Sequence, residues 1–234
     1  MLPAFRGDPD DLAARIEHTL LRPESTSQDV DAAALQARAW RVRALVVKPC
    51  YVGAAAALLQ GTEIRPVTVI GFPHGGQTPE VKAYEARDAV ARGAAEVDMV
   101  INVGALRAGR ADLVSDELRA VAEAAAGHPL KVIIETAYLT DAEKALAAEL
   151  AARAGAAYVK TSTGFAPTGA AVADIVLIRR VIGRALGIKA SGGIRTYAEA
   201  RALLEAGADL LGVSQTAAIL AGAEGDGPTA RVRG

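Results

Sequence analysis

RGAAEVD at residues 92–98, RAGAAYV at 153–159 and EAGADLL at 205–211 share one pattern. In each phrase an Ala- and Leu-rich stretch ends at a glycine, and a short apolar run begins directly afterwards. A glycine after helical periodicity is typical of a helix C-terminus, and a short apolar run is typical of a buried strand. Helices therefore alternate with strands, which predicts strand-helix units around a parallel sheet.

The same alternation extends along the chain and predicts eight strands. We expect them near residues 17–20, 44–47, 66–70, 96–101, 131–135, 157–160, 188–190 and 209–213. We expect helices near residues 10–15, 28–39, 53–59, 80–91, 111–126, 141–154, 170–183 and 196–206, with a short one after Ser214. Eight units in 234 residues, without a Pro- or Ser-rich linker, fit a (β/α)8 TIM barrel of the α/β class, with an extra N-terminal helix, better than an open doubly wound sheet.

The predicted domain organisation is a single barrel over residues 1–221. The remaining stretch, GAEGDGPTARVRG at 222–234, is Gly-rich and has almost no large apolar residue. Such a terminal segment buries too little surface to hold one conformation, so we expect a flexible tail there.

Composition narrows the class of function. Hydrophobic residues make up 51% of the chain and charged residues 23%, with a formal net charge of −1. No basic field exists to attract nucleic acid, and no uncharged apolar run has the eighteen or so residues that span a membrane. The first residues turn acidic before any signal-like stretch develops. We therefore expect a cytoplasmic protein that acts on small molecules.

Metal chemistry has little support in the sequence. The single cysteine, Cys50, cannot form an intrachain disulfide, and the three histidines are far apart in sequence, at His18, His74 and His128. This spacing matches no zinc or iron site. We expect neither a metal nor another cofactor, although Asp and Glu residues that are far apart in sequence are an alternative source of metal ligands.

Polar residues at predicted strand ends are the candidate catalytic groups, because the strands of such a barrel lead into the loops that form its active site. Asp98 lies within one strand, Lys160 ends another, and Lys189 lies in a third. Only six of the 26 basic residues are lysines, so two at strand ends need a reason. An arginine would serve equally well in an ion pair, but only a lysine amine can become a nucleophile.

Two readings of these lysines stay open at this point. Either lysine can be a structural ion-pair partner of Asp98. Alternatively, two neighbouring ammonium groups repel each other, and one loses its proton below the usual lysine pKa of about 10.4. The second reading gives one neutral nucleophilic lysine, one charged lysine and a carboxylate that relays protons.

Glycines follow the last two predicted strands. Ser191, Gly192 and Gly193 follow the seventh strand, and Gly212 and Ser214 belong to the end of the eighth. In barrels of this kind the loops after strands seven and eight hold phosphate through backbone N–H groups and a helix N-terminus. We expect a phosphate site there, which Gly164 also joins.

Five motifs resemble the deoxyribose-phosphate aldolase family, in order and at similar spacing over residues 10–220. They are VIGFPHGGQTPEVKAYEARDAV at 69–90, EVDMVINVGAL at 96–106, KVIIET at 131–136, YVKTSTGF at 158–165 and IKASGGIRT at 188–196. The resemblance implies a metal-free class I aldolase that reversibly cleaves 2-deoxy-D-ribose 5-phosphate to acetaldehyde and D-glyceraldehyde 3-phosphate. Its partners would be the small phosphosugar and aldehyde substrates, and a homo-oligomer (dimer or tetramer) is expected.

The resemblance also implies roles for individual residues. Lys160 matches the Schiff-base lysine, Lys189 the second lysine and Asp98 the proton-relay aspartate. The substrate-binding positions are Glu17, Thr19, Gly164, Gly192, Gly193, Gly212 and Ser214. Four features depart from the family pattern: Glu17 replaces an aspartate, Val46 replaces a common cysteine, LLGVSQ at 210–215 replaces RIGTSS or RIGTSA, and the last tyrosine is Tyr197, so no tail tyrosine exists.

Three alternative functions are compatible with the same residues. A fructose-bisphosphate aldolase or transaldolase would use the same lysine logic with a different donor. A non-catalytic phosphosugar-binding barrel would keep the phosphate loops without a reactive amine. A phosphosugar isomerase would need a carboxylate base and no covalent step.

Overall fold

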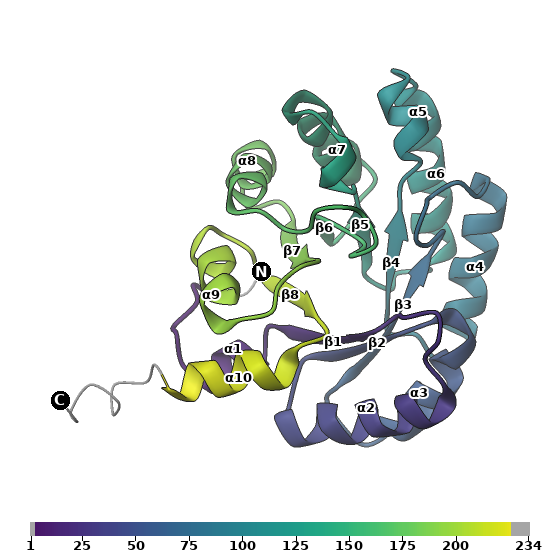
Figure 1. Cartoon of the computed structure of the whole chain (residues 1–234). Coiled ribbons are helices and arrows are strands. Elements are labelled where there is room, and N and C mark those ends of the chain that lie inside the picture. Colours follow the sequence, from purple (N-terminus) through teal and green to yellow (C-terminus); the bar gives the residue numbers. More distant parts are fainter. Residues whose placement is uncertain (1–2, 226–234) are drawn as a thin grey trace.

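The computed structural model describes residues 3–225 and forms a closed barrel of eight parallel strands (Figure 1). Each strand pairs with the next along the chain, and the first pairs with the last. The strands are β1 (Ile16–Leu20), β2 (Ala44–Val47), β3 (Arg65–Ile70), β4 (Glu96–Val100), β5 (Leu130–Ile133), β6 (Tyr158–Lys160), β7 (Gly187–Ser191) and β8 (Leu210–Val213). The predicted TIM barrel and its eight strands are confirmed.

Helices surround the barrel and cover the outer faces of its strands (Figure 1). They are α1 (Pro9–Ala13), α2 (Ser27–Trp40), α3 (Val52–Leu58), α4 (Pro79–Ala91), α5 (Val103–Arg107), α6 (Ala111–Ala124), α7 (Asp141–Arg153), α8 (Val172–Ile182), α9 (Tyr197–Glu205) and α10 (Thr216–Gly225), with 3-10 turns η1 (Pro49–Tyr51) and η2 (Thr136–Tyr138). The extra N-terminal helix, α1, packs against α10, the last helix described. Within residues 3–225, no helix combines the length and the apolar character needed to span a membrane.

Strand register brings the candidate residues together. Lys160 on β6 lies opposite Lys189 on β7, and Asp98 on β4 lies opposite Lys131 on β5. Glu17 on β1 lies opposite Gly212 on β8 at the seam that closes the barrel. Parallel neighbours in register point their side chains to the same face of the sheet. These charged side chains therefore share the barrel interior.

The apolar core has two parts. The larger part lies between strands and helices, where outward strand residues such as Val97 and Ile188 meet buried helix residues such as Leu118. The smaller part lies inside the barrel and is formed by Leu21, Ala44, Val46, Val67 and Val69. Val46, at the position of the family's cysteine, is therefore a packing residue on the apolar side of the interior.

Three features differ from the predicted elements. Helix α5 was not expected, because five residues are too few to show helical periodicity; its N-cap is Asn102, whose Oδ1 accepts from Ala105 N at 2.9 Å. Helix α8 begins at Val172 rather than near residue 170. Helix α10 continues to Gly225 and buries Ala223, so residues 222–225 of the predicted tail are helical. The rest of that tail, 226–234, lies outside the described residues.

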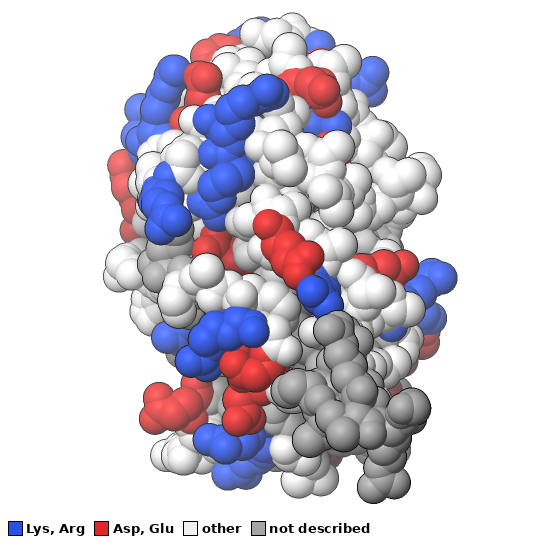
Figure 2. Space-filling model, turned by 90° about the vertical axis from the view of Figure 1, so that its left-hand side faces the viewer, with Lys and Arg blue, Asp and Glu red and all other residues white. Residues whose placement is uncertain are grey.

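Charges on the outer surface are mixed in sign. On the face turned to the viewer in Figure 2, Lys and Arg side chains alternate with Asp and Glu side chains. Nucleic-acid-binding surfaces carry a continuous basic patch instead. This face therefore offers no electrostatic footprint for a phosphate backbone.

Candidate active site

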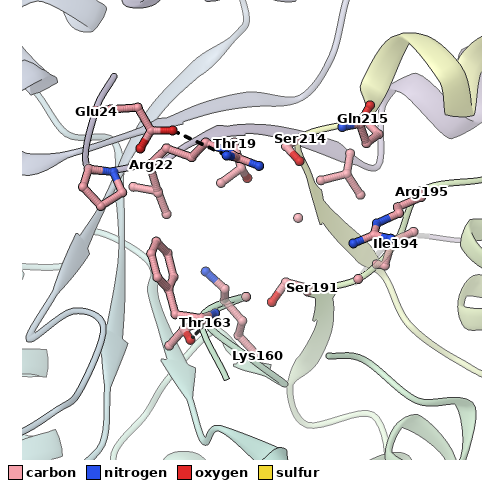
Figure 3. Close-up of a pocket in the computed structure, with 18 residues that line it drawn as sticks. Thr19, Arg22, Glu24, Lys160, Thr163, Ser191, Ile194, Arg195, Ser214 and Gln215 are labelled. Carbon is pink, nitrogen blue, oxygen red and sulfur yellow. Dashed lines mark hydrogen bonds and ion pairs between the residues drawn. The ribbon is translucent and has the colours of Figure 1, made fainter. Parts of the chain in front are cut away.

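A cavity of about 500 Å³ opens at the carboxyl ends of the strands (Figure 3). Loops after β1, β6, β7 and β8 form its wall. Seven of the ten predicted site residues line it: Thr19, Lys160, Gly164, Gly192, Gly193, Gly212 and Ser214. The other three, Glu17, Asp98 and Lys189, are fully buried in the barrel interior.

Lys160 connects the cavity to the buried residues. It ends β6, only 3% of its surface is exposed, and its amine points into the open space of the cavity in Figure 3. The same Nζ donates a hydrogen bond to Asp98 Oδ2 at 2.8 Å. Burial lowers the pKa of Lys160 to about 8, and the charge of Lys189 adds to this effect while Asp98 opposes it. An appreciable fraction of this amine is therefore neutral near physiological pH.

Asp98 is the centre of the buried charges. Its Oδ2 accepts from both Lys160 Nζ and Lys189 Nζ, the latter at 2.6 Å, and its Oδ1 accepts from Lys131 Nζ at 2.9 Å. Burial alone would raise the pKa of this carboxyl, but the three ammonium groups outweigh burial and hold the pKa well below its usual range. Asp98 is thus an anion shared by three lysines.

Glu17 and Thr19 take different positions although both belong to β1. Thr19 lines the cavity, and its hydroxyl donates to the backbone oxygen of Glu17 at 3.0 Å. The Glu17 carboxylate instead accepts hydrogen bonds from Lys189 Nζ and Arg43 Nη1 in the interior. Burial would raise its pKa, but Lys131 and Lys189 lower it to about 2. Glu17 therefore contacts the second lysine and does not reach the cavity.

The glycines at the cavity wall have two separate physical functions. Gly164, Gly192 and Gly193 have φ values of 85°, 84° and 78°, a region that residues with a side chain rarely adopt. A Cβ on Gly169 would lie 2.0 Å from the backbone oxygen of Gly192, so these two loops can approach only without side chains. Such turns leave the backbone exposed to the cavity, as anion sites require.

The sequence LLGVSQ at 210–215, which includes β8, leads directly into a helix. Ser214 and Gln215 line the cavity, and α10 begins at the next residue, Thr216. A helix N-terminus carries a partial positive charge and unpaired N–H groups. The departure of this segment from the family pattern therefore leaves a helix N-terminus beside the cavity.

Several charged residues of the site were missed by the sequence analysis. Lys131, Glu96 and Arg43 complete the buried charges, and Arg22 and Arg195 line the cavity. Glu96 lies two residues before Asp98 on one strand, a spacing that puts both on the same face. That spacing was a usable signal. Within residues 3–225, no group of three or more His, Cys, Asp and Glu side chains is arranged to hold a metal ion.

Comparison with known proteins agrees with this geometry. Residues 13–224 match the model of the DeoC/LacD family of aldolases. A deoxyribose-phosphate aldolase from Enterococcus faecalis is 50% identical over 218 residues, which cover 93% of this chain and 99% of the relative. One from Streptococcus suis is 47% identical over 212 residues, with 91% and 96% covered.

Solved structures give the same picture. A deoxyribose phosphate aldolase from Aeropyrum pernix, described as having a unique tetrameric structure, superposes with a TM-score of 0.87 at 33% identity and covers 93% of this chain and 92% of its own. A putative deoxyribose-phosphate aldolase from Coccidioides immitis gives 0.90 at 37% identity, with 94% and 87% covered.

Proposed function

Because the chain belongs to the DeoC/LacD family of aldolases, we propose that it cleaves 2-deoxy-D-ribose 5-phosphate reversibly to acetaldehyde and D-glyceraldehyde 3-phosphate. One observation carries the proposal: Lys160 presents a buried amine of lowered pKa to a cavity whose wall contains the glycine loops after β6, β7 and β8. An amine of this kind attacks an aldehyde carbon, and such loops hold a phosphate.

The first half of the reaction builds an electron sink. The neutral Lys160 amine attacks C1 of the open-chain sugar, the carbonyl electron pair moves to oxygen, and loss of water leaves a protonated Schiff base. A base then removes the proton of the C3 hydroxyl. The electrons of the C2–C3 bond move to C2 and toward the iminium nitrogen, and D-glyceraldehyde 3-phosphate leaves.

The second half restores the enzyme. The remaining enamine takes a proton at C2, and hydrolysis of the resulting Schiff base releases acetaldehyde and the Lys160 amine. Asp98 and Lys189 are the groups that we propose for the proton transfers, because Asp98 Oδ2 contacts both amines within 2.8 Å. Lys189 also disfavours a second positive charge on Lys160.

Binding of the substrate's phosphate group positions C1 for reaction. We propose that Gly164, Gly192 and Gly193 bind the phosphate through backbone N–H groups, and that Ser214 and the N-terminus of α10 complete the phosphate site. Arg195 lines the same part of the cavity and supplies a cation. When its phosphate end is bound, the substrate places its aldehyde carbon next to the Lys160 amine. The binding energy of the phosphate is thus used to orient the reacting atoms.

Trapping the covalent intermediate tests this function. Incubation with acetaldehyde and borohydride, followed by peptide mass mapping, should leave an ethyl group on Lys160 and abolish activity. Lys48 and Lys144, the two lysines that are only partly buried, serve as internal controls, and Lys160→Met should remain unmodified in the corresponding peptide. An ethyl group on Lys189 with Lys160 unmodified would contradict the assignment. Failure of acetaldehyde to act as donor would favour another Schiff-base aldolase, and absence of turnover would favour a binding barrel.

Two further properties belong to this proposal. We propose a homo-oligomer, either a dimer or a tetramer, which is supported by exposed apolar side chains on neighbouring helices: Val81 and Tyr84 on α4, and Leu113 on α6. We also propose a cytoplasmic location. Light scattering of the purified protein tests the first property, and cell fractionation tests the second.

A further inference from the structure

Seven charged side chains form one connected group inside the barrel, which we name the interior cluster. Its members are Glu17, Arg43, Glu96, Asp98, Lys131, Lys160 and Lys189. Lys131 and Lys189 are fully buried, and the side chain of Arg43 is 10% exposed. Buried charges are tolerated only when they are paired, so the balance of charge in this cluster has energetic consequences.

The cluster contains one cation more than it contains carboxylates. Arg43 and the three lysines can carry four positive charges, against three negative charges on Glu17, Glu96 and Asp98. Loss of one proton therefore makes the charges equal. Arginine keeps its proton, so the proton must leave one of the three lysines.

The contacts of each lysine indicate which one is least compensated. Lys131 Nζ lies within ion-pair distance of three carboxylates, at 2.6 Å from Glu96, 2.9 Å from Asp98 and 3.4 Å from Glu17. Lys189 contacts two carboxylates, those of Glu17 and Asp98. Lys160 contacts one, at 2.8 Å, and shares that carboxylate with both other lysines. Lys160 is thus the cation with the weakest pairing.

We propose that Lys131 is a positioning residue of the reaction: by pairing with Asp98 and Glu96 from within the barrel, it makes Lys160 the amine that gives up its proton. This inference rests on the proposed Schiff-base function. Lys131 occupies Asp98 Oδ1, which leaves only Oδ2 for the other two amines. Glu96 in turn is held by Arg43 at 2.6 Å, which fixes its carboxylate beside Lys131.

Other titratable groups face the cluster from neighbouring elements. Arg65 on β3 contacts Glu96 at 3.2 Å, but its side chain is 51% exposed and its charge is solvated. Tyr158 on β6 stays neutral, since burial raises its pKa. Glu135 follows β5, and its carboxylate accepts hydrogen bonds from the backbone N–H and the hydroxyl of Thr163. In the described part of the chain, no ion pair joins Glu135 to the cluster. Burial raises the pKa of Glu135.

Two substitutions should move the pH dependence in opposite directions. Lys131→Met removes a cation, so Lys160 should keep its proton to higher pH, and the acid limb of kcat/KM should shift upward by about one to two pH units. Glu96→Gln removes an anion, so the same limb should shift downward. A residue with only a structural role would lower activity without opposite shifts of the limb.

The double variant is the matched control. Lys131→Met with Glu96→Gln removes one charge of each sign and again leaves one excess cation, so its acid limb should return toward that of the wild-type enzyme. Removal of both partners also avoids an unpaired buried charge, so this variant and Glu96→Gln keep the test available if Lys131→Met alone does not fold. Identical limbs in all folded variants would overturn the inference.

A second measurement separates this inference from the proposed function. The rate of borohydride trapping of acetaldehyde on Lys160, followed by mass mapping across pH, reports the neutral amine directly. A shifted trapping profile in Lys131→Met supports the inference. Trapping on Lys160 with an unshifted profile leaves the aldolase function intact and overturns the role of Lys131. Absence of any trapping on Lys160 in the wild-type enzyme contradicts the function itself.

Discussion

Gly212 lies directly against the side chain of Lys189. A Cβ at position 212 would be 2.9 Å from Lys189 Cε, closer than such atoms approach, and 3.0 Å from Ser191 Cβ, which is a very tight contact. Gly212, whose register partner on β7 is Ser191, therefore leaves the space that the Lys189 side chain occupies where it reaches Asp98. This spatial requirement is distinct from the phosphate-binding role expected for Gly212 from the sequence.

Gly212→Ala should consequently impair chemistry more than substrate binding. The added methyl group displaces Lys189 from its 2.6 Å contact with Asp98, and we expect kcat to fall at least tenfold while KM changes by less than about threefold. Steady-state kinetics with deoxyribose 5-phosphate provides the measurement. A large rise in KM at unchanged kcat would instead assign Gly212 to phosphate binding.

Asp98→Asn should reduce kcat on the order of a hundredfold or more, the usual contribution of a positioned proton-transfer group. The amide keeps the size of the side chain but loses the negative charge that three lysines share. Circular dichroism and thermal unfolding control for folding. A folded variant that turns over substrate at the wild-type rate would make Asp98 only a structural counter-ion.

His18 should make stability depend on pH between about 6.5 and 4. Its ring is buried, with Nδ1 2.9 Å from Thr216 Oγ1 and an edge contact to Trp40, and burial lowers its pKa to about 4. As pH falls below 6.5, the unfolded chain binds a proton that the folded protein does not, so folding becomes less favourable. From pH 7 to 4.5 the loss should be about 2 kcal/mol.

Urea unfolding of wild-type protein and His18→Gln at both pH values measures this loss. The variant has a cost of its own from the altered contact with Thr216, but that cost is present at both pH values and cancels in the difference. Equal pH dependence in the two proteins would show that His18 does not titrate in the expected range.

Chelators should leave the aldolase activity unchanged. The iminium on Lys160 supplies the electron sink that a metal ion provides in other aldolases, so no step of the proposed reaction needs one. Activity after dialysis against EDTA is the measurement. Loss of activity that a divalent ion restores would argue against the Schiff-base reading as a whole.

Much of the fold was predictable because each strand and helix of the repeat has a distinct pattern of apolar residues and glycines within its own segment. Short apolar runs that follow a glycine indicate strands independently of their neighbours in space, and local side chains define helix starts, as at α7, where the Thr140 hydroxyl accepts from Glu143 N. Helix α5 was missed because a single turn has no periodicity. The end of α10 was missed because Gly-rich composition hides a helix whose stability comes from packing Ala223 against the core.

The site was harder to predict because the type of a residue does not show whether its side chain points into the barrel or outward. Lys160, Lys189 and Asp98 were selected on predicted strands, and the structure places both lysine amines within hydrogen-bond distance of Asp98. Lys131 lies in an equally short apolar strand, but a lone lysine there fits a solvent-facing position as well as an interior one. Glu17 was expected beside the substrate, and only its hydrogen bond in the structure shows that its carboxylate contacts Lys189.

The closure of the barrel by β1 and β8 has a consequence for how the chain matures on the ribosome. Glu17 and its partner Lys189 are 172 residues apart, which at 5–20 residues per second separates their synthesis by roughly 10 to 30 seconds. During that interval the nascent sheet has two open edges and a carboxylate without its ammonium partner. A chain that terminates before β7 keeps both defects, and one that terminates between β7 and β8 still has open sheet edges. Catalytic activity therefore requires a fully synthesised and closed barrel, and truncated products are natural substrates for chaperones and proteases.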